Sequence, residues 1–406
     1  MRSWAMWAGL CGLFISTTGW AKSYDLDYTV RFAPKEEVAY VTIRLEKGEN
    51  VRKLDFSLGE DGRYSDFKAD GRWEQESPER GVWKPANEES VLSYKVKINN
   101  VRGENGRFDA RMTDDWALLR GDDLIPAARL DQVDGTVLKA RLQFELPEGW
   151  KGVETGWPRI GTNRFRIDNP ARLFDRPTGW IVAGKIGSRR TTLGETTITV
   201  AAPIGEGMRR MDITTLLTFV WPHLQEVFPR PVKKILIVGA GDPMWRGGLS
   251  ATNSLYLHTD RPLVSENGTS TLIHEMTHVV SRIRATDKSD WITEGIAEFY
   301  AIELLRRAGG ISDERYEQIY KKLSKWGEEV KSLRTNRSSG PVTARAVILL
   351  KALDQEIRSN TQGAKSLDDV AQALMRIDKV TTDDFTDLTE NVLGAKSRTL
   401  NTRLLR

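Results

Sequence analysis

Alternating apolar and polar positions dominate the first half of the chain. Residues 28–32, 38–43 and 138–144 show this alternation, and Gly, Asp and Asn residues separate such segments. A period of two is typical of strands that bury one face, and the intervening residues favour turns. The pattern therefore predicts half-buried antiparallel strands from residue 24 to about residue 202.

The period changes after residues 204–207. An amphipathic helix is predicted at about residues 212–227, a strand at 234–238, and further helices from 312 to 406 with breaks at 338–341 and 362–363. The glycines after the strand, Gly239 and Gly241, lack a third glycine and a following amphipathic helix, so they do not indicate a dinucleotide-binding turn. Residues 252–258 are expected to form an edge strand, which an extended peptide could join by backbone hydrogen bonds.

Two of the four histidines in the 406 residues lie in the string HEMTH at positions 274–278. Apolar neighbours such as Leu272 and Val279 suit a buried helix, on which positions i and i+4 share one face. His274 and His278 can then bind one Zn²⁺, while Glu275 lies near enough to take a proton from a metal-bound water. Two unrelated surface histidines, the alternative, fit these apolar surroundings less well.

A catalytic zinc ion needs three protein ligands and an open fourth position for water. Glu294 and Glu298 offer two further carboxylates, one helical turn apart, in a segment expected to be helical from about residue 290 to residue 308. This segment and the HEMTH segment predict an antiparallel pair of helices. Spacing alone leaves the choice between the two carboxylates open.

The segment 249–300 resembles the gluzincin metallopeptidases. Residues 291–297, WITEGIA, are similar to the W-x-x-E-G-[FI]-[AT] element of that family, in which the Glu before Gly binds zinc. The resemblance implies that Glu294 is the third ligand of one Zn²⁺ per chain. It leaves Glu298 either as a carboxylate that orients a ligating histidine or as a solvated charge.

The overall layout is similar to the glycyl aminopeptidase-like branch and, more distantly, to aminopeptidase N-type enzymes. Residues 246–249 and 364–370 add to this likeness. The resemblance implies an α+β fold, in which an N-terminal antiparallel β-rich domain precedes a mostly helical zincin peptidase domain of thermolysin-like type.

Two positions depart from the family pattern. Ser250 stands where aminopeptidases place a Glu that holds the free amine of the substrate, which leaves the choice between exopeptidase and endopeptidase open. Arg337 stands where a Tyr usually donates to the oxyanion of the tetrahedral intermediate. The candidates to replace that donor are Tyr300, Tyr316, Tyr320, Arg337 and His258.

The N-terminus predicts export. Arg2 precedes an apolar run at residues 4–15, and small residues precede a cleavage site before Lys22, which is typical of a signal peptide. Cleavage would remove Cys11, the only cysteine, and leave zinc to His and carboxylate ligands. The apolar run is short for a membrane span, which needs ~20 residues. We therefore expect a periplasmic or secreted protein.

The net charge of +4 is small, and charges of both signs are interspersed, so composition gives no indication of a nucleic-acid or membrane-surface partner.

The predicted organisation is a signal peptide at 1–21, a β-rich domain at 22–205 and a gluzincin-like catalytic domain at 206–406. The chain is predicted to be a zinc-dependent peptidase that hydrolyses peptides or proteins. The alternative is a non-catalytic exported binding or assembly protein with a remnant zinc site. The oligomeric state stays open.

Overall fold

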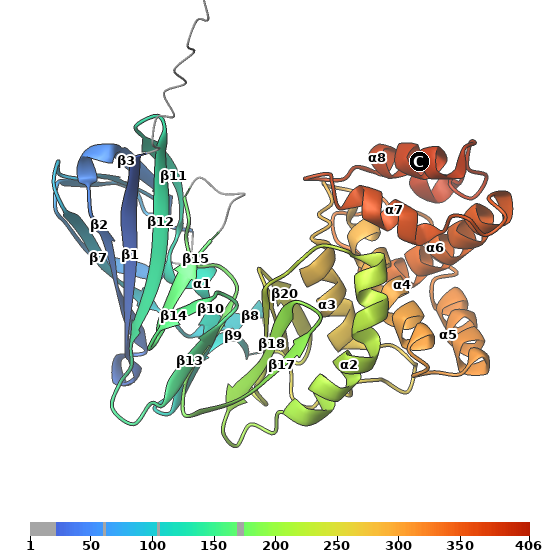
Figure 1. Cartoon of the computed structure of the whole chain (residues 1–406), viewed down its shortest axis with the longest axis horizontal. Coiled ribbons are helices and arrows are strands. Elements are labelled where there is room, and N and C mark those ends of the chain that lie inside the picture. The colour runs from blue at the N-terminus through green and yellow to red at the C-terminus, as the bar shows by residue number, and fades with distance from the viewer. Residues whose placement is uncertain (1–21, 60–61, 104–105, 169–173) are drawn as a thin grey trace, which may run out of the picture.

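A computed structural model of the chain describes residues 22–59, 62–103, 106–168 and 174–406 (Figure 1). The predicted signal peptide, with its Cys11, lies outside these residues. The fold is α+β, as expected: a β-rich part lies at one end of the molecule and a helical part at the other. None of the described helices is long and apolar enough to cross a membrane.

The largest sheet of the β-rich part has the strand order β14-β15-β12-β1-β2-β7-β4. Its strands are β1 (Lys22–Ala33), β2 (Val38–Leu45), β4 (Tyr64–Ala69), β7 (Ser90–Lys97), β12 (Thr136–Glu145), β14 (Arg159–Gly161) and β15 (Arg164–Ile167). The alternation works as predicted, because Leu26, Tyr28 and Val30 are all buried. In this sheet the prediction of antiparallel pairing was wrong for one pair of strands, because β1 and β12 run parallel over most of their length. They are distant in sequence, so no hairpin turn fixed their relative direction.

Two smaller sheets complete this part, with the orders β11-β3-β6-β5 and β13-β16-β10-β9-β8. Their strands are β3 (Val51–Ser57), β5 (Arg72–Ser77), β6 (Arg80–Lys84), β8 (Asn100–Arg102), β9 (Arg107–Met112), β10 (Trp116–Arg120), β11 (Ala127–Gln132), β13 (Gly152–Thr155) and β16 (Trp180–Gly184), and the short helix α1 is Gly121–Leu124. Buried residues of the three sheets pack into one core that includes Trp83, Phe144 and Phe165.

A fourth sheet, of order β17-β18-β19-β21-β20, lies between the β-rich part and the terminal helices (Figure 1). Its strands are β17 (Ile186–Leu193), β18 (Thr196–Pro203), β19 (Lys234–Val238), β20 (Gly248–Ala251) and β21 (Ser254–Leu257). The helix α2 (Arg210–Val227) connects β18 to its parallel neighbour β19. The sheet therefore crosses residues 205 and 206, where the sequence predicts a domain boundary.

The edge strand of this sheet next to α3 is β20, not the segment 252–258 that the sequence predicted. Residues 254–257 form β21, which lies between β19 and β20. The cause is a tight turn at Thr252 and Asn253, where Asn253 adopts the left-handed conformation with a φ of 52°. This turn folds residues 248–251 back along the outer side of β21 and gives them the edge position.

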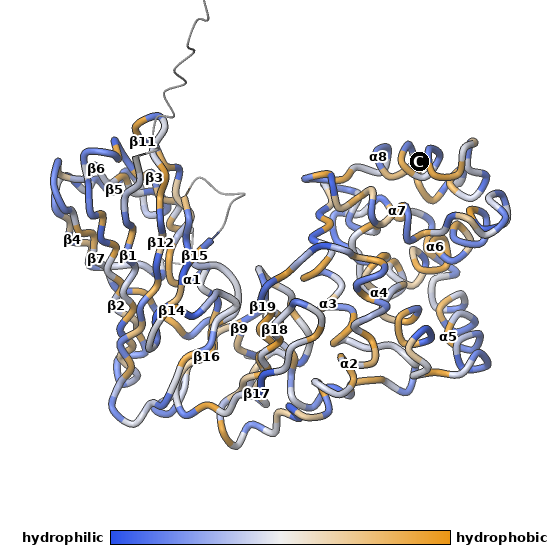
Figure 2. The backbone as a smooth tube through the Cα atoms, viewed as in Figure 1, coloured by the Kyte–Doolittle hydropathy of each residue, from blue (hydrophilic) through white to orange (hydrophobic). Residues whose placement is uncertain are grey.

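The remaining helices are α3 (Thr271–Ser281), α4 (Asp290–Arg307), α5 (Asp313–Trp326), α6 (Pro341–Asn360), α7 (Leu367–Leu374) and α8 (Thr382–Leu393). Apolar and polar positions interleave along them (Figure 2). Their apolar faces share one core with α2 and one face of the fourth sheet, and this core includes Leu272, Trp291 and Leu350. The breaks predicted at 338–341 and 362–363 lie directly before α6 and after it.

Candidate metal centre

Helix α3 presents His274 and His278 on one face. Ser270 begins the helix, because its side chain accepts a hydrogen bond from the backbone N–H of Ile273. Leu272, Met276 and the other apolar residues of α3 are buried in the core. The face that remains carries the two histidines, as the i and i+4 spacing predicts.

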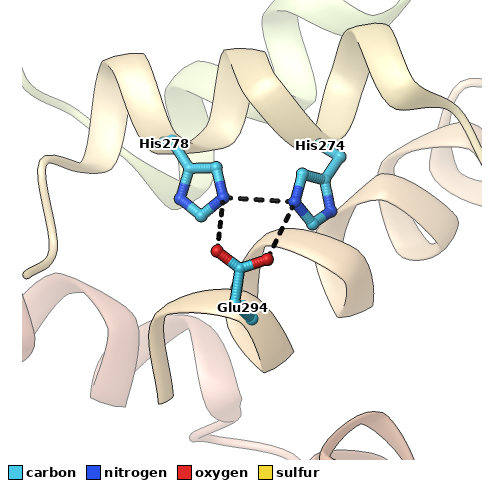
Figure 3. A group of neighbouring side chains, drawn as sticks. All are labelled: His274, His278 and Glu294. Carbon is cyan, nitrogen blue, oxygen red and sulfur yellow. Dashed lines mark hydrogen bonds and ion pairs between the residues drawn. The ribbon is translucent and has the colours of Figure 1, made fainter. Parts of the chain in front are cut away.

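Helix α4 places Glu294 opposite these histidines. Trp291 is completely buried near the start of α4 and fixes the helix in the core. Gly295 allows close packing against α6, since a Cβ at this position would lie 3.0 Å from the Cβ of Ala346. Figure 3 shows the carboxylate of Glu294 pointing toward both imidazole rings across the space between α3 and α4.

The three predicted ligands come together with distances that suit a tetrahedral metal. The two histidine Nε2 atoms lie 3.1 Å apart, and the carboxylate oxygens of Glu294 lie 3.4 Å from His274 Nε2 and 3.5 Å from His278 Nε2. Ligands about 2.0–2.1 Å from a tetrahedral zinc ion lie about 3.3 Å from one another. All three ligand atoms lie within 4.8 Å of one another, so the residues present fit a zinc ion.

Glu298 orients one of these histidines. Its Oε2 atom lies 2.8 Å from His274 Nδ1, on the side of the ring away from Glu294. A carboxylate at Nδ1 holds the proton there and leaves the Nε2 lone pair free for a metal. Of the two roles left open for Glu298, the structure therefore supports orientation of a ligand and not a solvated charge.

The electrostatics of the cluster favour a bound cation. Although burial works against it, the hydrogen bonds with Glu294 and Glu298 hold the pKa of His274 well above its usual range. Burial, together with the charge on His274, lowers the pKa of His278 to about 4. Burial opposes ionisation of Glu294, but the two histidines keep its pKa below the usual value. His278 and Glu294 are thus in the neutral and ionised forms that bind metals, while the carboxylates around His274 favour a proton whose place a metal ion would take.

Glu275 lies beside the cluster and is 9% exposed. Burial raises the pKa of its carboxyl group, which suits a group that accepts a proton near neutral pH. The hydroxyl and the backbone N–H of Ser250 lie near this carboxyl group and partly offset the rise in its pKa. Gly248, on the same edge strand, lies so close that a Cβ there would be 2.6 Å from the Cγ atom of Glu275. Sequence reasoning missed this contact, whose only trace is the Gly247-Gly248 pair.

The five candidate oxyanion donors are dispersed. The Tyr300 hydroxyl donates to Asp368 and the Tyr316 hydroxyl to Glu303. Tyr320 is 4% exposed, and His258 is 1% exposed with its Nε2 atom 3.5 Å from Asp242. The exposed Arg337 is the candidate whose charge acts on the cluster, because it contributes, after the histidines, to the lowered pKa of Glu294.

The fold resembles that of solved aminopeptidase N family and M1 zinc metallopeptidase structures, which agrees with the predicted gluzincin relationship. The solved structures that resemble the chain with a probability of 1.00 include members of the aminopeptidase N family and M1 zinc metallopeptidases. Their sequence identities lie well below the level at which an activity can be transferred, so the likeness shows the fold. No family model and no curated protein sequence matches the chain.

Two of these structures illustrate the likeness. An aminopeptidase N family protein from Idiomarina loihiensis is 14% identical, with a TM-score of 0.66, and the match covers 92% of this chain and 72% of that one. An M1 zinc metallopeptidase mutant from Deinococcus radiodurans, bound to the substrate Tyr-Ser-Ala, is 16% identical, with a TM-score of 0.58. That match covers 95% of this chain and 94% of the other, so the two folds correspond over nearly their whole lengths.

Proposed function

We propose that this protein is a zinc-dependent peptidase, with His274, His278 and Glu294 as the ligands of one Zn²⁺ and a helical domain of the thermolysin-like zincin type. The observation that carries the proposal is the position of Glu275, a buried carboxylate with a raised pKa, directly beside a three-ligand cluster of suitable geometry. The M1 relative bound to a peptide supports peptides or proteins as the substrate class.

A zinc ion in this cluster would supply a Lewis acid that polarises the scissile carbonyl and lowers the pKa of water. Glu275 accepts a proton from the attacking water and passes it to the leaving amine. Ser250 lies next to the Glu275 carboxylate and favours its ionised form. Since β20 is the edge strand and its residues 248–251 are only half-buried, an extended peptide can pair with it next to Glu275.

The alternative function, an exported binding or assembly protein with a remnant zinc site, rests on the two departures at Ser250 and Arg337. A structural zinc site is closed by four protein ligands, whereas a catalytic site keeps one position open. Among the described residues the metal-binding group has three members. This number favours catalysis over a structural remnant.

The test separates metal binding from chemistry. We expect Glu275→Gln to retain about one zinc per chain, measured by elemental analysis, and to lose at least ~10²-fold in kcat/KM on the best peptide of an unbiased library. His278→Ala is the matched variant, and we expect it to lose the metal as well as the activity. A Glu275→Gln protein that hydrolyses the peptide at the parent rate would refute the role of Glu275 as general base.

Export belongs to the same proposal. Cleavage before Lys22 would release the β-rich and helical parts without residues 1–21, to the periplasm or to the medium. N-terminal sequencing of the protein from a cell fractionation would test this directly. A cytoplasmic protein that retains Met1 or Arg2 would contradict it.

A further inference from the structure

A cavity of about 680 Å³ opens beside the metal centre. His278 and Glu294 belong to its wall, so whatever binds in the cavity lies next to the reacting bond. The rest of the wall comes from the edge strand and turn at 250–253, the end of α3 with the following loop at 282–284, and the segment 375–378 after α7. These segments are far apart in the sequence.

The wall of this cavity is strongly basic. Four arginines line it, namely Arg230, Arg282, Arg284 and Arg376, against two acidic residues, Glu294 and Asp378. Asp378 is already paired with Arg284, and Glu294 is a ligand of the metal cluster. Three arginines therefore lack an acidic partner among the residues that the structure describes, and a bound zinc ion would add to the positive charge.

Arg282 is the central one of these arginines. It ends α3 in the left-handed conformation, with a φ of 52°, four residues after His278. One nitrogen of its guanidinium donates to the side-chain oxygen of Asn253 at 2.8 Å, which fixes the side chain against the β20–β21 turn. Burial and the neighbouring charges of Arg230 and Arg284 lower the pKa of Arg282. These like charges oppose one another unless an anion binds between them.

Arg230 is held in the same way, by neutral acceptors. Its two terminal nitrogens donate to the backbone carbonyls of Ser281, at 3.2 Å, and Met375, at 2.6 Å. Burial lowers the pKa of this arginine too. A cation at a helix C-terminus can simply stabilise the helix, and that accounts for Arg282 at the end of α3 and for Arg230, whose acceptors end α3 and α7. It does not account for a third guanidinium, that of Arg376, on the same cavity.

We propose that this cavity is a substrate subsite that binds a carboxylate group of the peptide, with Arg282 as the principal partner. The inference rests on the proposed peptidase function and names its substrate class. The carboxylate is either the C-terminal carboxylate of a short peptide or the side chain of an Asp or Glu residue. The planar guanidinium suits either source, since both offer two oxygens for paired hydrogen bonds.

The amine-binding position is consistent with this inference. Ser250 stands where the aminopeptidase pattern has a carboxylate, and its neutral hydroxyl lies near Glu275. A free substrate amine would therefore meet no acidic anchor at this position and would lie near an arginine-lined wall. The same wall that repels an amine attracts a carboxylate, so the charge of the cavity selects for the acidic part of a peptide.

The test uses the zinc-loaded full chain and four N-acetylated peptides of one sequence. They combine a free or amidated C-terminus with Glu or Gln at the position next to the scissile bond. We expect the parent protein to prefer a carboxylate over its neutral counterpart by about 10- to 100-fold in kcat/KM in at least one of the two comparisons. The comparison that shows the preference identifies the source of the carboxylate.

Two variants test the role of Arg282 itself. Arg282→Met should abolish the preference, whereas Arg282→Lys should retain part of it. The control is Arg398→Met, which changes an arginine whose side chain is 88% exposed and which does not line the cavity. If Arg282→Met fails to fold, the four peptides still decide the question on the parent protein.

Binding to the inactive Glu275→Gln protein, measured by calorimetry, separates this inference from the proposed function. If no peptide is hydrolysed but the carboxylate peptides bind at least tenfold more tightly, the subsite is supported and the catalytic proposal fails. If peptides are hydrolysed with no preference for a carboxylate, the subsite is refuted while the peptidase proposal stands. Binding of none of the four peptides refutes both.

Discussion

Gly248→Ala tests whether the edge strand holds the general base. Gly248 lies on β20, and an added Cβ would be 2.6 Å from the Cγ atom of Glu275 and 2.8 Å from its Oε1 atom. Carbon atoms in contact normally lie about 3.5–4.0 Å apart. The Glu275 side chain must therefore move by about 1 Å, and it cannot simply swing into solvent because it is only 9% exposed.

The displacement of Glu275 should lower the rate of hydrolysis strongly and the free energy of unfolding only modestly. A shift of ~1 Å in a catalytic group can lower the rate by ~10²-fold, because the proton acceptor no longer meets the attacking water. Overpacking of one methyl group destabilises a fold by ~1–3 kcal/mol. The same Cβ would also lie 2.6 Å from the Cγ2 atom of Thr271. Adding Thr271→Ser removes that second overlap, so it should recover stability without recovering the rate.

The assay measures kcat/KM, zinc content and the free energy of unfolding for each variant. Gly152→Ala is the matched control, because its added Cβ would meet only Ile186 at an ordinary 3.8 Å. We expect Gly248→Ala to retain zinc and to lose about 10²-fold in kcat/KM, and Gly152→Ala to match the parent. In a protein that already carries Glu275→Gln, adding Gly248→Ala should lower kcat/KM only a little further, since both changes act on the side chain at position 275.

Parent-like turnover by Gly248→Ala would refute the reasoning, because the carboxylate cannot keep its position against a Cβ at 2.6 Å. Loss of zinc together with the rate would also count against it. That result would mean that the strain reaches His274 and His278 through α3 and does not act on the base alone. Fully additive losses in the Glu275→Gln background would show that Gly248 acts through another group.

Two further predictions concern zinc affinity and stability. Glu298→Ala removes the carboxylate at His274 Nδ1, so zinc affinity measured by competition with a chelator should fall by about 10- to 100-fold, and an unchanged affinity would rule out an orienting role. Burial lowers the pKa of Lys234 to about 8, below the ~10.4 of a free lysine. The folded protein therefore binds fewer protons than the unfolded chain between these values, and its stability relative to Lys234→Met should rise across that pH range by about 3 kcal/mol. Urea unfolding that gives parallel pH profiles for the two proteins would contradict this.

The sequence by itself determined the parts of the site that depend on local geometry. His274 and His278 share a face because of the helix period, and the resemblance of residues 291–297 to a known element selected Glu294. The structure brings these three side chains together as expected. The predictions of α2 and β19 also depended on local geometry, since a periodic apolar pattern indicates whether a segment is a helix or a strand wherever it lies.

Only the tertiary structure decided which segments meet. The pattern of residues 252–258 is that of a strand, but nothing in it shows that residues 248–251 fold back to take the edge position. The parallel pairing of β1 with β12 and the contact of Gly248 with Glu275 join residues that are distant in the sequence. Such contacts depend on the packing of whole elements, which no local period encodes.

The basic cavity is the clearest example. The chain has 60 basic residues. Nothing in the sequence distinguishes Arg230, Arg282 and Arg376 from the others. Folding brings them to one wall beside His278, because α3 ends there and the segment after α7 crosses it. Spacing along the chain and the resemblance of residues 291–297 determined the metal ligands, whereas the basic wall of the cavity arose only when distant helices and a strand edge packed together.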